Sequence, residues 1–186
     1  MAIPPRLAAV RLTTPRLAIE PLRPDDAPEL YPILRDPRLY AYFSETPPAS
    51  AGALRARFAR YAAGPPPGRD ERWLNWIVRA RPDRRPIGTL QSTVEPAAGR
   101  AYVAYVFAVA AWGQGYATEA TGALVTWLHA EGVPDVEALV DARNERSLRL
   151  LRRLGFAPVA APPEPAGDLR LRHRAAPGLP AGPAPD

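Results

Sequence analysis

The sequence predicts a single α+β domain with a mixed, mostly antiparallel sheet of about seven strands and about four helices. The chain has 186 residues, of which 47% are hydrophobic, enough for one substantial core but not for two. Three strand-like runs follow one another in the middle of the chain, separated by short turns. A strand, a helix and a further strand come next, which is the pattern of a parallel crossover.

The first third of the chain predicts one strand and two helices. The run Arg16–Leu22 alternates between apolar and polar residues, as a strand does. A helix is expected over residues 27–35, with Asp25 as its N-cap, and a second helix over Ser50–Ala63, capped by Ser50. The proline-rich segment Gly64–Asp70 then marks an exposed connection.

The meander that follows comprises Arg72–Ala80, Pro86–Pro96 and Arg100–Val109. The turn-forming segments between these runs favour antiparallel pairing of neighbours. After a glycine turn, apolar residues with a period near 3.6 predict a helix that stops at Gly132.

The last part of the folded chain is predicted to hold a strand over Asp135–Asp141, a helix ended by Gly155, and two final strands, Phe156–Ala160 and Asp168–Arg174. Residues 175–186 are rich in Pro, Gly and Ala and nearly uncharged. We therefore expect a folded domain over residues 1–174 and a disordered tail over 175–186.

The composition excludes several classes of function. The chain has no cysteine, so disulfides, thiolate metal sites and thiol nucleophiles are ruled out. It has two histidines, too few for a histidine-rich zinc site, and we therefore predict no bound metal. No apolar run is long enough for a membrane span or a signal peptide, so a cytoplasmic protein is expected. The net charge of +5 comes from arginine alone, and nucleic-acid binding is a third reading that rests only on this charge.

The stretch AWGQGYATEA, Ala111–Ala120, lies between a strand and a helix and places two glycines around Gln114. Such a turn is either an ordinary tight turn, a dinucleotide fingerprint or a cradle for another phosphate-bearing ligand, since helix N-termini favour anions. A dinucleotide fingerprint requires a third glycine where Thr118 stands, and a P-loop requires a lysine that the chain lacks. These differences favour a different phosphate-bearing ligand.

The run WGQGYATEA, followed after one helix and one strand by RNERSLRLLRRLGF, resembles the acetyl-CoA-binding half of the GNAT superfamily of N-acetyltransferases. The TPRL segment, Thr14–Leu17, is similar to the start of the branch that contains ribosomal-protein N-terminal acetyltransferases. The resemblance covers about Leu12 to Arg174. It implies the acyl-CoA N-acyltransferase fold and the transfer of an acetyl group from acetyl-CoA to a primary amine, on a protein N-terminus or a small molecule.

The resemblance also implies which residues hold acetyl-CoA. The glycine turn would cradle the pyrophosphate with backbone amides, although Trp112 stands where the family usually has Gln or Arg. The strand before the turn would splay from its parallel neighbour and hold the pantetheine arm. The implied coenzyme contacts are Tyr105, Phe107, Val109, Trp112, Gly113, Gln114, Gly115, Tyr116, Ala117, Thr118, Asn144, Ser147, Arg149 and Arg152.

The family mechanism implied here is direct attack of a neutral amine on the thioester carbonyl. Many members carry a tyrosine as general acid where this chain has Leu151, which leaves Ser147 as the candidate acid. Glu95 is the candidate base, with Glu20 and Glu119 as the other carboxylates considered and a water relay as the alternative.

The acceptor site carries no motif. Tyr42, Trp73, Asn75 and Gln91 are the candidate substrate contacts, with core packing as the competing interpretation for the aromatic residues. Because the usual tyrosine and an obvious base are missing, a GNAT-fold protein that binds acyl-CoA with little transferase activity is the alternative function. A homodimer paired through the last strands is common in the family and is compatible with the resemblance.

Overall fold

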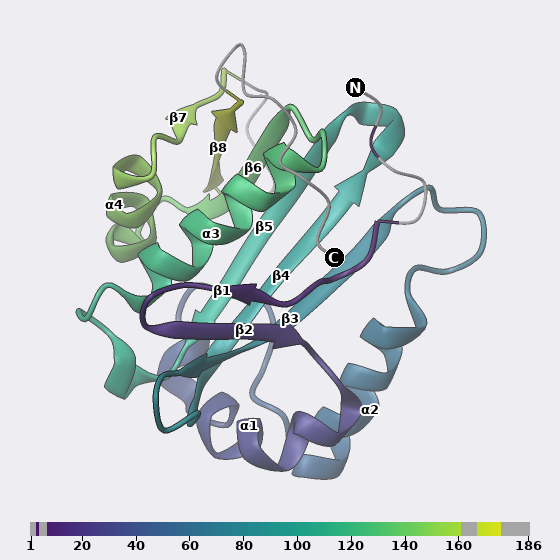
Figure 1. Ribbon diagram of the computed structural model, residues 1–186. Coiled ribbons are helices and arrows are strands. Elements are labelled where there is room, and N and C mark those ends of the chain that lie inside the picture. Colours follow the sequence, from purple (N-terminus) through teal and green to yellow (C-terminus); the bar gives the residue numbers. More distant parts are fainter. Residues whose placement is uncertain (1–2, 4–6, 161–166, 176–186) are drawn as a thin grey trace.

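The computed structural model describes residue 3 and residues 7–160 and 167–175. Within these residues, the chain forms one sheet with the strand order β1-β2-β3-β4-β5-β6-β8-β7, seen edge to edge in Figure 1. All neighbouring strands are antiparallel except β5 and β6, which are parallel. The α+β class and the mixed, mostly antiparallel sheet are therefore confirmed.

The elements have the following bounds. The strands are β1 (Leu12–Thr13), β2 (Leu17–Pro21), β3 (Arg72–Ala80), β4 (Pro86–Glu95), β5 (Arg100–Phe107), β6 (Asp135–Asp141), β7 (Ala157–Pro158) and β8 (Asp168–Arg174). The α-helices are α1 (Ala27–Leu34), α2 (Ala51–Ala63), α3 (Tyr116–Ala130) and α4 (Glu145–Arg153). Short 3₁₀ turns include η1 (Pro24–Asp26), η2 (Pro37–Tyr40) and η4 (Val109–Ala111).

Most of the predicted elements are confirmed within one or two residues, and β3 and β6 match at both ends. The short strand β1 was not predicted, because two residues carry no periodic signal. β5 ends at Phe107 rather than Val109, since the chain turns into η4 there. The N-cap prediction for α1 was wrong: the carboxylate of Asp25 pairs with Arg55, and the residue before the helix is Asp26. Residues 161–166 of the last connection and 176–186 of the predicted tail lie outside the described residues.

The two faces of the sheet have separate cores. Helices α3 and α4 cover one face, where Trp76 and Leu124 are fully buried. Helices α1 and α2 pack on the other face, where Leu54 and Ile77 are buried. Trp76 and Ile77 are consecutive residues of β3 and point to opposite faces, as the alternation of a strand requires.

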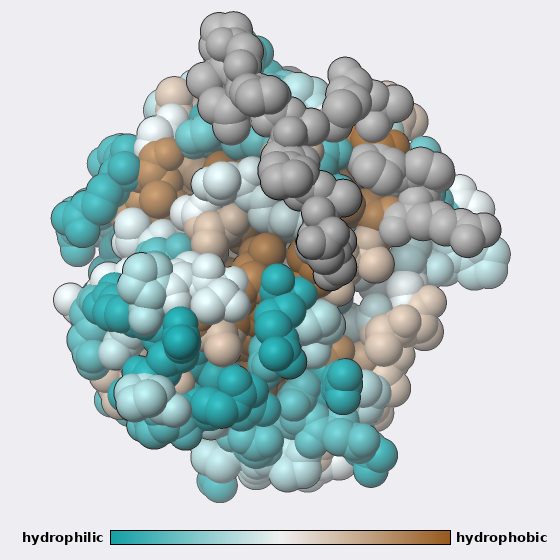
Figure 2. Space-filling view, viewed as in Figure 1, coloured by the Kyte–Doolittle hydropathy of each residue, from teal (hydrophilic) through white to brown (hydrophobic). Residues whose placement is uncertain are grey.

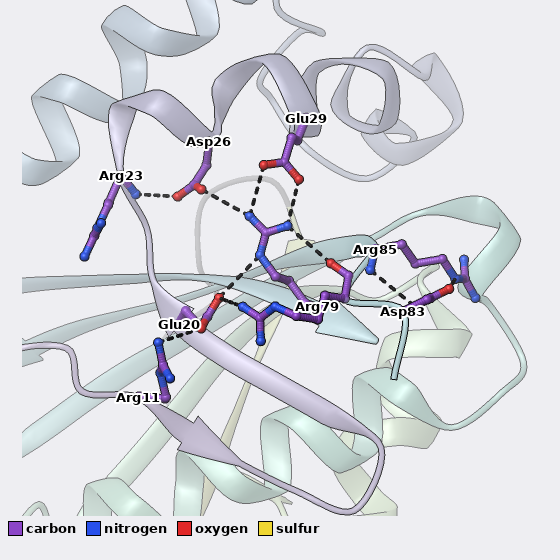
Figure 3. Close-up of polar contacts among 9 residues, drawn as sticks. Arg11, Glu20, Arg23, Asp26, Glu29, Arg79, Asp83 and Arg85 are labelled. Carbon is purple, nitrogen blue, oxygen red and sulfur yellow. Dashed lines mark hydrogen bonds and ion pairs between the residues drawn. The ribbon is translucent and has the colours of Figure 1, made fainter. Parts of the chain in front are cut away.

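An ion-pair network anchors α1 to the sheet (Figure 3). The guanidinium of Arg79 on β3 lies 2.7 Å from Glu29 on α1, 3.3 Å from Asp26 and 3.4 Å from Glu20 on β2. The Arg79 side chain is only 11% exposed, so these charges interact in a partly desolvated setting. Hydrophilic residues gather over α1 and the β3–β4 turn in the lower part of Figure 2. The network fixes the position of the helical layer.

The parallel pairing of β5 with β6 is short. It joins Arg100–Tyr102 to Asp135–Glu137 and then stops, while β5 stays paired with β4 as far as Phe107. β6 is paired along its whole length with β8. The two parallel strands therefore part beyond Tyr102 and leave a wedge in the middle of the sheet, as the family resemblance implies.

Candidate active site

The glycine turn leads directly from the parted strand into α3. Gly113 and Gly115 have φ values of 75° and 79°, in the left-handed region that glycine adopts most easily. The side-chain amide of Gln114 donates to the Ala110 carbonyl at 2.7 Å and holds the turn in shape. Because α3 begins at Tyr116, its first backbone amides have no partner within the helix. The turn therefore presents N–H groups and the positive end of a helix dipole.

Arg16, in the β1–β2 turn, braces this turn from one side. Its guanidinium donates to the Gln114 carbonyl at 2.9 Å, pairs with Glu119 at 2.6 Å and lies 4.6 Å from the centre of the Tyr116 ring. Glu119 also accepts a 2.5 Å hydrogen bond from the Thr14 hydroxyl. Burial alone would raise the pKa of Glu119, but the bonds from Thr14 and Arg16 lower it. Glu119 thus joins α3 to the β1–β2 turn.

Arg146, in the first turn of α4, reaches the same turn from the other side. Its guanidinium carbon lies 4.4 Å from the centre of the Trp112 ring, in cation–π geometry. The indole N–H of Trp112 donates to the Phe107 carbonyl at 2.9 Å, which fixes the ring. Arg149 instead pairs with Glu145 at 2.9 Å on the helix surface, and Arg152 is exposed in the last turn of α4. Arg149 and Arg152, the two arginines implied by the resemblance, thus lie on the exposed surface of α4, and Arg146 lies over Trp112.

A hydroxyl pair bridges the wedge between the parted strands. The phenol oxygen of Tyr105 on β5 and the Ser147 hydroxyl on α4 are 2.7 Å apart. Burial raises the pKa of Tyr105 to about 12, with the hydrogen bond to Ser147 opposing the shift. Asn144 caps α4 by accepting from the Ser147 backbone amide at 3.2 Å, and Leu151 is fully buried. The sequence analysis named Tyr105 as a coenzyme contact but did not foresee the hydrogen bond between its phenol and Ser147.

Two cavities lie on the α1–α2 side of the sheet and share Gln91 and Ala104. The first, of about 190 Å³, occupies the wedge; its lining is Gln91, Thr93, Tyr102, Val103, Ala104 and Leu139. The second, of about 80 Å³, lies beneath the helical layer. Its lining is Leu22, Leu34, Tyr40, Phe43, Glu45, Leu54, Arg57, Phe58, Tyr61, Thr89, Gln91, Ala104, Tyr105 and Val106.

The four predicted acceptor contacts lie in different settings. Gln91 lines both cavities, and Asn75 is its direct partner across β3 and β4. Trp73 is half-buried further along β3, where its indole N–H donates to Glu71 at 3.0 Å. Tyr42 is 44% exposed in the loop after η2. Of the four, the structure places Gln91 in the lining of both cavities, and Asn75, Trp73 and Tyr42 are not among the lining residues.

The candidate bases lie away from the Tyr105–Ser147 pair or are engaged in ion pairs. Glu95 stands opposite Arg100 at the far end of the β4–β5 hairpin and pairs with it at 2.7 Å. Arg100 is five residues before Tyr105 on β5, a separation of roughly 16 Å. Burial would raise the pKa of Glu20, but its contacts with Arg84, Arg11 and Arg79 lower it. The carboxylates that sequence reasoning considered therefore do not meet the hydroxyl pair.

Metal-binding and membrane-spanning features are absent from the described part of the chain. None of its residues form a group of three or more His, Cys, Asp or Glu side chains that could hold a metal ion. His129 and His173 instead hydrogen-bond to each other at 2.8 Å. No helix in this part is long and apolar enough to cross a membrane.

The fold and the glycine turn at the parted strands define the class of acyl-CoA-dependent N-acyltransferases. The model of the acetyltransferase (GNAT) domain family matches residues 16–157. The chain belongs to this family, whose members use acetyl-CoA.

Solved structures with the same fold include enzymes with different acceptors. RimL, a ribosomal-protein acetyltransferase in complex with coenzyme A, aligns with a TM-score of 0.77 and 16% identity over 89% of this chain and 98% of that chain. A GNAT-family acetyltransferase from Bacillus anthracis aligns with a TM-score of 0.72 and 15% identity, over 89% of this chain and 98% of that chain. An aminoglycoside acetyltransferase in complex with coenzyme A aligns with a TM-score of 0.68 and 18% identity, over 85% of this chain and 94% of that chain. No match was found among curated proteins.

Proposed function

We propose that this protein transfers the acetyl group of acetyl-CoA to a primary amine by direct attack. The observation that carries the proposal is the convergence of three features on the wedge between β5 and β6. These are the glycine turn at the start of α3, the parted strand β5, and the Tyr105–Ser147 hydroxyl pair. Membership of the GNAT family supports the reaction class.

The residues around the turn fit the anionic part of the coenzyme. A side chain at Gly113 or Gly115 would be strained, and the bare backbone leaves the amides approachable. The backbone from Gly113 to Thr118 would hold the pyrophosphate, and Arg146 adds a cation beside it. Asn144 has its carbonyl oxygen occupied by the helix cap, so its amide N–H groups remain to bind the pantetheine arm.

The hydroxyl pair fits the role of general acid. Acetyl-CoA supplies an activated acyl carbonyl and a thiolate leaving group. The Tyr105 phenol is protonated at neutral pH, as tyrosine is at its ordinary pKa, and Ser147 can pass a proton between the phenol and the wedge. This arrangement would replace the family tyrosine at the position of Leu151.

The attacking amine must lose a proton, and we infer that water in the wedge accepts it. Glu20 and Glu119 are paired with arginines, and their own pKa values are lowered. Glu95 lies at the distant end of the β4–β5 hairpin. Gln91 and Thr93 give the wedge polar side chains that can hold such water.

For the acceptor, we propose an amine on a protein N-terminus or a small molecule, as in the ribosomal-protein branch. RimL and the aminoglycoside enzyme share this fold and differ in acceptor, so the fold leaves both kinds of amine open. The second candidate is an acyl-CoA-binding protein with little transferase activity. The buried Leu151 at the position of the usual acid favours it.

Calorimetric titration with acetyl-CoA, followed by thiol release over a panel of amines, tests the proposal. Since the chain has no cysteine, every thiol detected comes from the coenzyme. Absence of coenzyme binding would overturn both candidates. Binding without thiol release above the rate of spontaneous hydrolysis, on any acceptor, would favour the second.

A further inference from the structure

The cavity beneath the helical layer contains a guanidinium that is only loosely paired. Arg57, on α2, lines the cavity and has a side chain that is 23% exposed. Besides its hydrogen bond with the Tyr40 hydroxyl, it forms an ion pair with Glu45 at 3.5 Å and donates to the Thr46 carbonyl, also at 3.5 Å. Both distances are at the long limit for a hydrogen bond. By contrast, Arg79 approaches Glu29 to 2.7 Å.

The position of Arg57 is nevertheless well supported. The Tyr40 hydroxyl donates to the Leu34 carbonyl at 2.7 Å, which leaves its oxygen free to accept. Burial raises the pKa of Tyr40, and Arg57 beside the hydroxyl opposes this shift. Leu54, three residues before Arg57, and Phe58, the residue after it, are buried and fix the helix. Arg57 is therefore held in place with donors left over.

Its partner Glu45 is the solvent-exposed member of the pair: the Glu45 side chain is 64% exposed on the connection between η2 and α2. An exposed ion pair at this distance contributes little to stability. A carboxylate arriving inside the cavity could displace Glu45 into solvent and bind the guanidinium at a shorter distance.

The same cavity is lined by Ala104, Tyr105 and Val106 of β5, and it shares Gln91 and Ala104 with the cavity in the wedge. With a volume of about 80 Å³, the cavity suits a small acceptor. Glu45 and Arg57 are its charged lining residues, so the lining has no excess of negative charge to attract a polycation such as an aminoglycoside.

From these contacts we propose that Arg57 binds a carboxylate of the acceptor, so that the acceptor is a small amine carrying a carboxylate within a few bonds of its nitrogen. The inference rests on the proposed acetyl transfer at the same site. The carboxylate can belong to a free amino acid or to an acidic residue at a peptide N-terminus. In both cases the planar fork of arginine matches it.

The test compares acceptors that differ in this carboxylate, with rates expressed per neutral amine because a neighbouring carboxylate raises the pKa of the amine. Leucine is paired with leucinamide, and Asp-Ala-amide with Asn-Ala-amide, in the thiol-release assay and in calorimetric titrations of the coenzyme-saturated protein. Kanamycin serves as the polycation. We expect kcat/KM to be about tenfold or more higher for the acid of at least one pair, and the pair concerned identifies the source of the carboxylate.

Three variants sharpen the test. Arg57→Gln should raise KM for the acid about tenfold and leave kcat for the amide unchanged. Arg55→Gln, two residues away on α2 and paired with Asp25 on the surface, should change neither. Glu45→Gln, which removes the competing carboxylate, should lower KM for the acid severalfold.

The proposal is overturned if acids and amides bind and react equally in the unmodified protein, or if Arg57→Gln affects both alike. Titration with acetyl-CoA alone separates this outcome from failure of the proposed function. Coenzyme binding with turnover of amides or kanamycin, but no preference for acids, would leave the transferase function standing and reject Arg57 as the carboxylate site.

Discussion

The hydroxyl groups of Tyr105 and Ser147 lie 2.7 Å apart, although 42 residues separate them in the chain. One belongs to the parted strand β5 and the other to the first turn of α4, so their bond spans the wedge in which we propose that acetyl transfer takes place. The pair therefore links the strand before the glycine turn to the helix that follows β6, at the site proposed for acetyl transfer.

Tyr105→Phe removes the phenol and leaves the ring. We expect kcat to fall about 100-fold, with little change in acetyl-CoA affinity, because the variant loses a proton donor and no coenzyme contact of its backbone. Steady-state kinetics and coenzyme titration measure the two effects. Tyr31→Phe, on α1, is the control, because the Tyr31 hydroxyl bonds the Ala49 carbonyl away from both cavities; an equal loss there would contradict the assignment.

Ser147→Ala should lower kcat to a similar extent, and the double variant should be little worse than either single one. The two hydroxyls act as one unit, so their effects are not additive. A double-mutant cycle in kcat measures this coupling. Strict additivity would show that the two residues act independently.

Arg146→Gln should weaken acetyl-CoA binding about tenfold, since it removes a cation beside the glycine turn. Calorimetric titration at two salt concentrations checks this, because the effect of a charge should shrink as ionic strength rises. Arg149→Gln, on the same helix and paired with Glu145, is the matched control. Equal losses of acetyl-CoA affinity in both variants would show that the effect comes from the net charge of the protein and not from the position of Arg146.

Gly113→Ala should lower the free energy of unfolding by about 1 to 2 kcal/mol and weaken coenzyme binding, because alanine is strained at a φ of 75°. No heavy atom lies within 4 Å of the added methyl group, so backbone strain is isolated from steric clash. Gly52→Ala, within α2, should instead stabilise by about 0.5 to 1 kcal/mol. Denaturant unfolding of both variants gives the comparison, and a stable Gly113→Ala protein would contradict the strain.

Stability should fall as the pH drops from about 7.5 to 5.5. Burial, and then the neighbouring His129, lower the pKa of His173 below its ordinary value of 6.5. The unfolded chain therefore binds a proton more readily than the folded chain, and folding stability is lost as the pH falls through this range. Denaturant unfolding across the range measures the slope. His173→Gln should flatten it, and an unchanged slope in this variant would assign the effect to other groups.

Local patterns carried much of the fold. The strand-like runs Arg72–Ala80 and Asp135–Asp141 located β3 and β6, and the spacing of Leu148 and Leu151 located α4, since each signal lies within one element. The glycine turn was readable because its chemistry depends on backbone freedom at two neighbouring positions. The short strand β1 and the cap of α1 were not predicted correctly, because they depend on pairing and capping partners elsewhere in the fold.

The acceptor side shows the opposite case. Arg57 and Tyr40 carry no motif, and they become neighbours of Gln91 and Tyr105 only when the helical layer packs on the sheet. Arg146 was one of several arginines in the second motif until the orientation of α4 placed it over Trp112.

The sequence by itself determined the fold class, the family and the coenzyme, because these depend on periodicity and on short segments with fixed spacing. Only the tertiary structure decided which hydroxyls meet, which arginine reaches the turn and which charges line the acceptor cavity. Those contacts join residues far apart in the chain, and packing rather than local spacing sets their distances.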